Sequence, residues 1–400
     1  MFHYADEKEI KKGKVTDVYF ERTRKILEKK NVHKLVRAEF IVKTFPYPEN
    51  WGVLAGIEEA VELLKGLKVN PVRKRGFSNG VKVRGMAEGT IFSLEEPVLD
   101  IEGDYLEFGI YETAILGLLC QASGIATKAA RCKKIAGEKL VLSFGARRMH
   151  PVMTPMIERS AYIGGCDGVA TIKAAELIGI EPSGTMPHAL ILILGDTVKA
   201  VKAFDEIIEP KVKRIALIDT FEDEKFEALN VAEALGKKLY AVRLDTPASR
   251  RGNFLQLLKE VRWELDLRGY KEVKLFVSGG IDEKRISELN PLVDAYGIGT
   301  AISNAPVMDF AMDIVEIDGK PIAKRGKMSG GKDIYRCPSC FVHTMVPQGD
   351  KLKRVCNCKS KYENLLNLII ENGKVLHPAS KPQEIREYVL EQLKFYSLSL

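Results

Sequence analysis

The central part of the chain alternates between two kinds of segment. From residue 113 to about 305, short aliphatic and β-branched runs are separated by amphipathic stretches, such as Phe254–Leu265, whose apolar residues recur at helical spacing. Strands that alternate with helices form βαβ units and therefore a parallel sheet. Five or more such units in succession predict an α/β fold of the (β/α) barrel kind. The predicted strands are Leu140–Ser143, Val169–Thr171, Leu190–Leu194, Arg214–Ile218, Leu239–Leu244, Val273–Val277 and Val293–Tyr296.

The regions on either side of this alternation predict separate parts. Residues 1–112 combine a helical spacing within Trp51–Leu64 with short strand-like runs and turn signals, which indicates an N-terminal α/β domain. The alternating region 113–305 is the expected catalytic barrel. Residues 306–330 are strand-like, and we expect them to return to the N-terminal domain. Residues 331–400 are expected to form a metal-binding module and a C-terminal helix.

The composition is that of a folded protein, because 46% of the 400 residues are apolar and 29% are charged. The net charge of +7 is a mild excess and does not by itself indicate a nucleic-acid binder. No signal-peptide apolar segment follows the first residues, and runs such as Ala189–Leu194 are far shorter than the roughly 18 residues that span a bilayer. We therefore expect a cytoplasmic protein without a membrane segment.

Four of the seven cysteines have the spacing of zinc ligands. Cys337 and Cys340 form a Cys-x-x-Cys pair, and Cys356 and Cys358 follow after 15 residues as Cys-x-Cys. Two such pairs can supply four thiolates to a tetrahedral Zn²⁺, which would contribute much of the folding free energy of so small a module. Four reduced, uncoordinated thiols are the alternative. The basic residues of the module, among them Lys351, Lys353 and Arg354, leave RNA binding open as a second interpretation.

Two glycine-rich loops follow the last two predicted strands of the barrel. In β/α barrels the active site lies at the carboxyl ends of the strands, and a phosphate often binds after the final ones. Glycines let the backbone approach a ligand closely, and helix N-termini favour anions. The loops therefore predict a phosphate site, although either one alone could be a plain turn; their candidate residues are Ser278, Gly279, Gly280, Gly299 and Thr300.

Charged residues lie near the ends of the other strands. Asp219 and Asp245 each follow a strand and precede a threonine, so they could bind sugar hydroxyls or Mg²⁺, or could simply be helix N-caps. Arginines that converge on glycine loops suit a substrate with phosphates and a carboxylate, although singly each is more typical of an ion-paired surface residue. These arginines are Arg131, Arg147 and Arg243.

His188 stands in the segment Ser183–His188, before an apolar run. A loop histidine in this position is usually structural. A neutral imidazole can also act as a nucleophile toward a phosphoryl group.

Several segments together are similar to one enzyme family, and their order matters more than any single one. They are Thr16–Tyr19, Tyr111–Thr113, Ile125–Thr127 with Ala130-Arg131, Phe144–Arg148, Gly164–Gly168, Ser183–His188, Arg243–Thr246, Ser278–Gly280 and Gly297–Thr300. Over residues 1–325 the chain resembles the nicotinate phosphoribosyltransferases of the archaeal kind. The resemblance implies the type II phosphoribosyltransferase fold, in which an N-terminal α/β domain packs on an incomplete (β/α) barrel. A zinc-ribbon or rubredoxin-like module is an addition in part of the family.

The resemblance also implies an activity. Such enzymes join nicotinate to 5-phosphoribosyl 1-diphosphate in NAD biosynthesis, giving nicotinate mononucleotide and pyrophosphate. They work as dimers with shared active sites, with Mg²⁺ beside the diphosphate. Many couple the reaction to ATP through a phosphorylated histidine, which corresponds to His188.

The resemblance implies a role for each candidate residue. Tyr19 of the neighbouring subunit and Phe144 would enclose the pyridine ring, with Asp167 beside it. Arg243 and Arg147 would hold the carboxylate and nearby phosphates. Asp245 and Asp219 would bind the ribose diol and Mg²⁺, and the two glycine loops would bind the 5′-phosphate.

The chain departs from the family pattern at Cys166, at Gly168–Thr171 and at Met186-Pro187, so the ring pocket is less well defined by the resemblance at these positions. Quinolinate and nicotinamide phosphoribosyltransferases are alternatives within the same class. An RNA-binding or base-exchanging barrel protein with a zinc ribbon is the alternative from another class.

Overall fold

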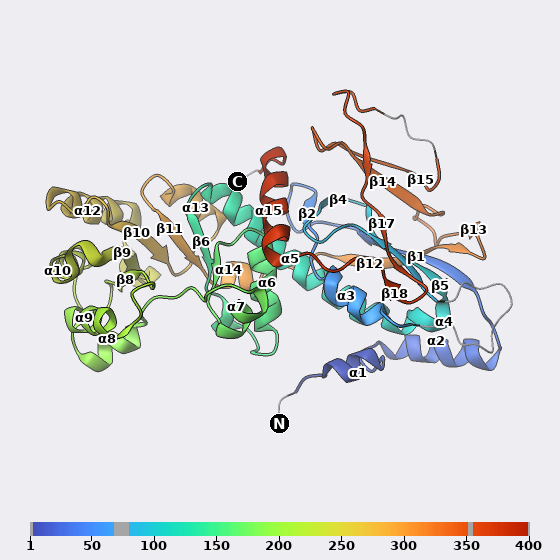
Figure 1. Ribbon diagram of the computed structural model, residues 1–400, viewed down its shortest axis with the longest axis horizontal. Coiled ribbons are helices and arrows are strands. Elements are labelled where there is room, and N and C mark those ends of the chain that lie inside the picture. Colours follow the sequence, from blue (N-terminus) through green and yellow to red (C-terminus); the bar gives the residue numbers. More distant parts are fainter. Residues whose placement is uncertain (1–2, 68–79, 351–354, 399–400) are drawn as a thin grey trace. The chain divides into compact units, whose positions relative to one another are not determined.

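The computed structural model describes residues 3–67, 80–350 and 355–398. The chain divides into two compact units, one of which runs up to Thr127 and resumes at Pro306, while the other is Lys128–Ala305. The predicted boundary at 112/113 lies at the start of a long helix, α5 (Glu112–Ala136), whereas the two units divide within this helix, after Thr127. In Figure 1 the first unit carries the colours of both ends of the chain, and the second runs from green through yellow to orange.

The Lys128–Ala305 unit is built on a six-stranded parallel sheet with the order β7-β6-β11-β10-β9-β8. This order is that of a barrel opened at one place, because the consecutive strands β7 and β8 are the two edges and do not pair. The expected incomplete barrel is therefore confirmed. The strands are β6 (Leu140–Ser143), β7 (Gly168–Val169), β8 (Arg214–Leu217), β9 (Leu239–Leu244), β10 (Lys274–Ser278) and β11 (Ala295–Ile298).

Amphipathic helices cover this sheet. α12 begins after Asn253, whose side chain accepts a hydrogen bond from the Gln256 amide, and it buries the apolar side chains that predicted it. Helices α9 and α10 pack beside each other, and α10 packs against α12, along the strands β8 and β9 (Figure 1). The helices are α6 (Thr154–Ile163), α7 (Ile172–Ile178), α8 (His188–Leu194), α9 (Thr197–Ile207), α10 (Glu224–Leu235), α11 (Ala248–Arg251), α12 (Phe254–Leu267), α13 (Glu283–Leu289) and α14 (Thr300–Ser303).

The predicted strand Leu190–Leu194 was wrong, because this segment belongs to helix α8. A short apolar run cannot be assigned to strand or helix by periodicity alone. The flanking residues decide: Pro187 precedes the first helical residue, and Gly195, with a φ of +75°, ends the helix in the left-handed conformation. Ile193 is 83% exposed as a result, whereas only Ile191 of this helix is buried.

The other unit is built on a seven-stranded antiparallel sheet with the order β13-β12-β1-β5-β3-β17-β18. Its strands come from both ends of the chain, since β12 and β13, which follow Pro306, lie in the same sheet as β1, β3 and β5. The strands are β1 (Leu35–Val42), β3 (Lys82–Gly85), β5 (Pro97–Asp104), β12 (Phe310–Ile317), β13 (Lys320–Pro321), β17 (Asn367–Glu371) and β18 (Lys374–Val375). A two-stranded sheet of β2 (Trp51–Val53) and β4 (Ile91–Ser93) accompanies it.

Three helices of the same unit bury apolar side chains in one core with this sheet: α3 (Ile57–Leu64), α4 (Tyr105–Phe108) and the first half of α5. Phe40, Leu99 and Ile101 of the strands and Leu64 of α3 are fully buried there. The unit also contains the helices α1 (Glu7–Lys11), α2 (Val18–Lys29) and α15 (Pro382–Gln392). The helical spacing noted within Trp51–Leu64 thus begins as strand β2 and becomes helical only at Ile57.

Buried ion pairs link the cysteine-bearing module to the large sheet. The module has three strands, β14 (Lys332–Arg336), β15 (His343–Pro347) and β16 (Glu363–Asn364). Arg84 of β3 donates to Asp333 of β14 at 2.7 Å and to Asp100 of β5 at 2.8 Å. Burial raises the pKa of Asp100, and the two neighbouring guanidinium groups of Arg84 and Arg37 oppose that rise. Removing one partner of such a pair would leave a buried charge uncompensated.

Among the described residues, one helical stretch, Tyr105–Ala136, is long and apolar enough to cross a membrane by length and composition. Half of its most apolar window is buried inside the protein. A core helix passes the same test, so this finding is weak evidence for a membrane span.

Candidate functional site

A cavity of about 720 Å³ lies within the barrel unit, at the carboxyl ends of its strands. The chain segments that follow β6, β9, β10 and β11 contribute to its wall, together with the loop before α8. Most of the predicted site residues line it. These are Phe144, Arg147, His188, Arg243, Asp245, Ser278, Gly279, Gly280, Gly299 and Thr300.

The first glycine loop is shaped by contact with the carboxylate at the neighbouring strand end. Gly279 and Gly280 both have positive φ, +78° and +65°. A Cβ on Gly279 would lie 2.9 Å from Oδ1 of Asp245, so a side chain there would collide with the carboxylate as well as strain the backbone. The same Asp245 oxygen accepts a hydrogen bond from Ser278 Oγ at 2.7 Å. The loop and the carboxylate therefore form one continuous wall.

His188 lies between two carboxylates. It is the first residue of α8, and its Nδ1 is 3.0 Å from Thr220 Oγ1. Its Nε2 is 3.7 Å from Asp219 Oδ2 and 3.8 Å from Asp245 Oδ2. The imidazole side chain is 38% exposed, which leaves the ring accessible from the cavity that it lines.

Asp219 is buried, and neither of its carboxylate oxygens has a hydrogen-bond partner among the described residues. Burial raises its pKa, nearby His188 opposes the rise, and Asp245 adds to it. Asp219 and Asp245 both lie within 4 Å of His188 Nε2, and carboxylate oxygens gathered in this way suit a hard divalent cation such as Mg²⁺. The donor set of Asp219 and Asp245 thus fits the metal that the resemblance implies.

Arg243 and Phe144 form the aromatic and cationic part of the cavity. The Arg243 guanidinium lies 6.0 Å from the Phe144 ring centroid and donates to the Met186 carbonyl at 3.2 Å. Its Nε is buried with no partner among the described residues, and burial lowers its pKa, an effect that Asp245 and Asp219 oppose. A cation held beside an aromatic face, with a donor still unused, can bind the carboxylate of a flat aromatic acid.

Besides Asp219, which lies behind His188, three predicted site residues do not line the cavity. Arg131 is buried and pairs with Glu283, with 3.0 Å between Nε and Oε1. Asp167 accepts hydrogen bonds from the Val141 amide at 2.8 Å and from Lys133 at 3.0 Å, so its carboxylate supports the start of β6. Tyr19 lies on α2 in the other unit, is 55% exposed, and its hydroxyl is 3.4 Å from an Asp17 oxygen. The substrate-binding roles of these three remain predictions.

Sequence reasoning missed Glu158 of α6, which is fully buried. Its two carboxylate oxygens accept from the amides of Ala170 and Thr171, each at 2.9 Å. Ala170 lines the cavity, so Glu158 fixes one wall of it. The only signal in the sequence was indirect, since Gly168–Thr171 is where the chain departs from the family pattern.

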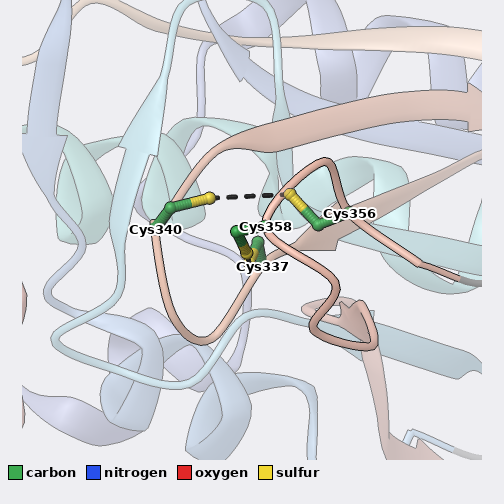
Figure 2. Close-up of side chains that lie close together, drawn as sticks. All are labelled: Cys337, Cys340, Cys356 and Cys358. Carbon is green, nitrogen blue, oxygen red and sulfur yellow. Dashed lines mark hydrogen bonds between the residues drawn. The ribbon is translucent and has the colours of Figure 1, made fainter.

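The four cysteines of the small module converge, as Figure 2 shows. Their sulfur atoms all lie within 4.8 Å of one another, with 3.3 Å between Cys337 and Cys358 and 3.6 Å between Cys340 and Cys356. Four thiolates bound at about 2.3 Å around one Zn²⁺ would have sulfur atoms about 3.8 Å apart. The donor set and its spacing therefore fit zinc. The basic residues that motivated the RNA-binding interpretation, Lys351, Lys353 and Arg354, lie outside the described residues.

Comparisons with known proteins match both units. Residues 17–123 match the family model of the quinolinate phosphoribosyl transferase N-terminal domain, and residues 125–313 match that of its C-terminal domain. The crystal structure of nicotinate-nucleotide pyrophosphorylase from Pyrococcus furiosus is similar over 100% of this chain and 99% of that one, with a TM-score of 0.94 and 57% identity.

Two further relatives extend the comparison. A nicotinate phosphoribosyltransferase of Mycobacterium tuberculosis is 30% identical over 323 residues, which cover 74% of this chain and 68% of the relative. The structure of human nicotinic acid phosphoribosyltransferase shares the fold, with a TM-score of 0.72 and 20% identity over 96% of this chain and 94% of that one. The chain therefore belongs to the type II phosphoribosyltransferase family, of the nicotinate kind.

Proposed function

We propose that this enzyme joins nicotinate to 5-phosphoribosyl 1-diphosphate, giving nicotinate mononucleotide and pyrophosphate. The observation that carries the proposal is the placement of Arg243, a half-buried guanidinium with a buried and unused Nε donor, beside Phe144 in the cavity that the glycine loops also line. A ring-bearing carboxylate and a phosphorylated sugar can thus occupy one site. The named activity of the relatives supports the same substrate pair.

The chemistry requires the protein to position its substrates and to stabilise charge. Breaking the bond between C1 and pyrophosphate gives the ribose positive character and leaves negative charge on the departing group. We expect Asp245 and Asp219 to face the ribose diol and to hold Mg²⁺. The metal would offset the charge of the departing pyrophosphate. Phe144 and Arg243 would orient the pyridine ring so that its nitrogen faces C1, while the loop at Ser278–Gly280 holds the 5′-phosphate.

We further propose a homodimer in the cytoplasm, in which Tyr19 of a second copy completes the ring site. Helix α2 supports this arrangement, because Val18, Tyr19 and Ile26 are each more than half exposed although they are large and apolar or aromatic.

Quinolinate is the second candidate substrate, since both matching family models carry its name. It has a second carboxylate, which would need a further cation beside the ring. The candidates for this further cation are Arg147 and Arg148, which also line the cavity. The resemblance assigns Arg147 instead to the carboxylate of nicotinate and the nearby phosphates.

The substrate assignment predicts the order of activity in a panel of pyridines. Nicotinate, nicotinamide and quinolinate are each supplied with 5-phosphoribosyl 1-diphosphate and Mg²⁺. We expect kcat/KM to be at least about tenfold higher for nicotinate. Its one carboxylate can pair with Arg243, whereas nicotinamide has no carboxylate and quinolinate has a second one that needs a further cation. Pyrophosphate release measures the rate. Turnover of quinolinate, with none of nicotinate, would contradict the assignment.

His188 is proposed to couple the reaction to ATP hydrolysis by accepting a phosphoryl group. Thr220 fixes Nδ1, so Nε2 is the atom free to react. In His188→Ala the ratio of rates with and without ATP should fall to about one. His150→Ala is the matched control, because His150 is exposed and does not line the cavity. An ATP effect of equal size in both variants would exclude a phosphohistidine at residue 188.

The cysteine cluster is proposed to hold a structural Zn²⁺. Metal analysis of the purified protein should find about one zinc per chain, and Cys340→Ser should lower both the zinc content and the thermal stability. Cys120→Ser serves as the control, since Cys120 lies outside the cluster. A wild-type protein with well under one zinc per chain after mild purification would argue against the metal.

A further inference from the structure

Arg251 is a buried cation behind the wall of the cavity, and the function proposed above leaves it unused. It is the last residue of the short helix α11 and is only 8% exposed. Arg251 itself does not line the cavity. It contacts Gly279, which lines the cavity, and Thr246, which follows the cavity-lining Asp245.

The Arg251 guanidinium bridges the loops after two neighbouring strands. Its Nε donates to the Thr246 carbonyl at 2.9 Å, in the loop that follows β9 and carries Asp245. Its Nη2 donates to the Gly279 carbonyl at 2.7 Å, in the glycine loop that follows β10. The centroid of the Phe254 ring lies 4.5 Å from the guanidinium carbon, so the ring packs against the guanidinium group. The planar fork of an arginine is suited to holding two acceptors at a fixed separation.

The charge of Arg251 has no carboxylate partner among the described residues, because both of its hydrogen bonds go to carbonyl groups. Burial lowers its pKa and nearby Arg285 lowers it further, while Asp245 and Asp219 act in the opposite direction. An unpaired buried cation next to a cavity raises the local potential, which favours an anion there.

We propose that Arg251 is a positioning residue that locks the Asp245 loop to the Gly279 loop and thereby sets the affinity for the phosphoribosyl substrate. The inference rests on the proposed function, since it takes this cavity to be the phosphoribosyl site. Arg251 does not touch the substrate. It fixes the separation between the carboxylate that faces the ribose and the backbone that faces the 5′-phosphate, and its charge favours the bound phosphate.

A purely structural role would give a different result. If Arg251 only stabilised the fold, its loss would lower the thermal stability and the amount of active protein. The KM values for the two substrates would then change by similar factors. If it sets the geometry of the phosphoribosyl subsite, the KM for 5-phosphoribosyl 1-diphosphate should change far more than the KM for nicotinate. Among the described residues Arg251 makes no hydrogen bond to Arg243, and the ring that it packs against is Phe254 rather than Phe144.

The test compares Arg251→Met and Arg251→Lys with Arg250→Met. Arg250 is the adjacent exposed residue of the same helix, so its variant removes an equal charge without breaking the bridge. For Arg251→Met we expect the KM for 5-phosphoribosyl 1-diphosphate to rise roughly ten- to a hundredfold, with a change of less than about threefold in the KM for nicotinate. Arg251→Lys keeps the charge but not the fork, and should lie in between.

Calorimetric binding of ribose 5-phosphate separates this inference from the proposed function, since it needs no turnover. We expect weaker binding to both Arg251 variants than to Arg250→Met, whichever pyridine the enzyme uses. If Arg251→Met does not fold, the comparison of Arg251→Lys with Arg250→Met tests the inference by itself. Equal ribose 5-phosphate affinity in Arg251→Lys and Arg250→Met, or no binding by the wild-type protein, would overturn the inference.

Discussion

The parallel register of the barrel sheet is the constraint on which the site depends. Val277 of β10 lies opposite Leu244 of β9 and Tyr296 of β11, and Tyr296 lies opposite Val141 of β6. The four strands therefore end at the same edge, where the next residues are the candidate ligands of the substrate. Asp245, Ser278 and Phe144 are far apart in the sequence, and this register alone makes them neighbours. A shift in any strand would separate the carboxylate from the glycine loop.

The same edge holds polar groups that the protein leaves unpaired. Burying a polar group without a partner costs about 1–3 kcal/mol, and more for a charged one. Asp219 and Arg243 both have such atoms among the described residues, whereas the buried charged side chains elsewhere in the barrel unit have hydrogen-bond partners, as Arg131 has in Glu283 and Glu158 has in two backbone amides. The strands that flank them hold these side chains in place, so a ligand or metal can supply the missing partners without reorganising the site.

Much of the barrel could be predicted from the sequence, because parallel strands are short apolar runs bounded by turns. Leu140–Ser143 and Leu239–Leu244 match β6 and β9 to the residue. The glycine loops and Asp245 could be located because residues after a strand end lie at the rim. The run at Leu190–Leu194 could not be assigned, because its composition suits a strand as well as a helix, and only the flanking proline and glycine favour the helix.

The environment of a charged residue was beyond sequence reasoning. Nothing local distinguishes Arg243, which lines the cavity, from Arg131, which is paired with a glutamate 152 residues away. Glu158 and Arg251 act on backbone groups, so they have no motif. Their partners are set by how α6 and α11 pack against loops that come later or earlier in the chain.

The central claim is that the cavity at the carboxyl edge of the barrel sheet binds the pyridine nucleotide through Arg243. Its most direct test is the calorimetric affinity for nicotinate mononucleotide of the wild-type protein and of Arg243→Met, with thermal unfolding to confirm that both are folded. A charge-assisted hydrogen bond of about 1.5–3 kcal/mol predicts a loss of roughly tenfold or more in affinity. Equal affinity in the two folded proteins would contradict the account.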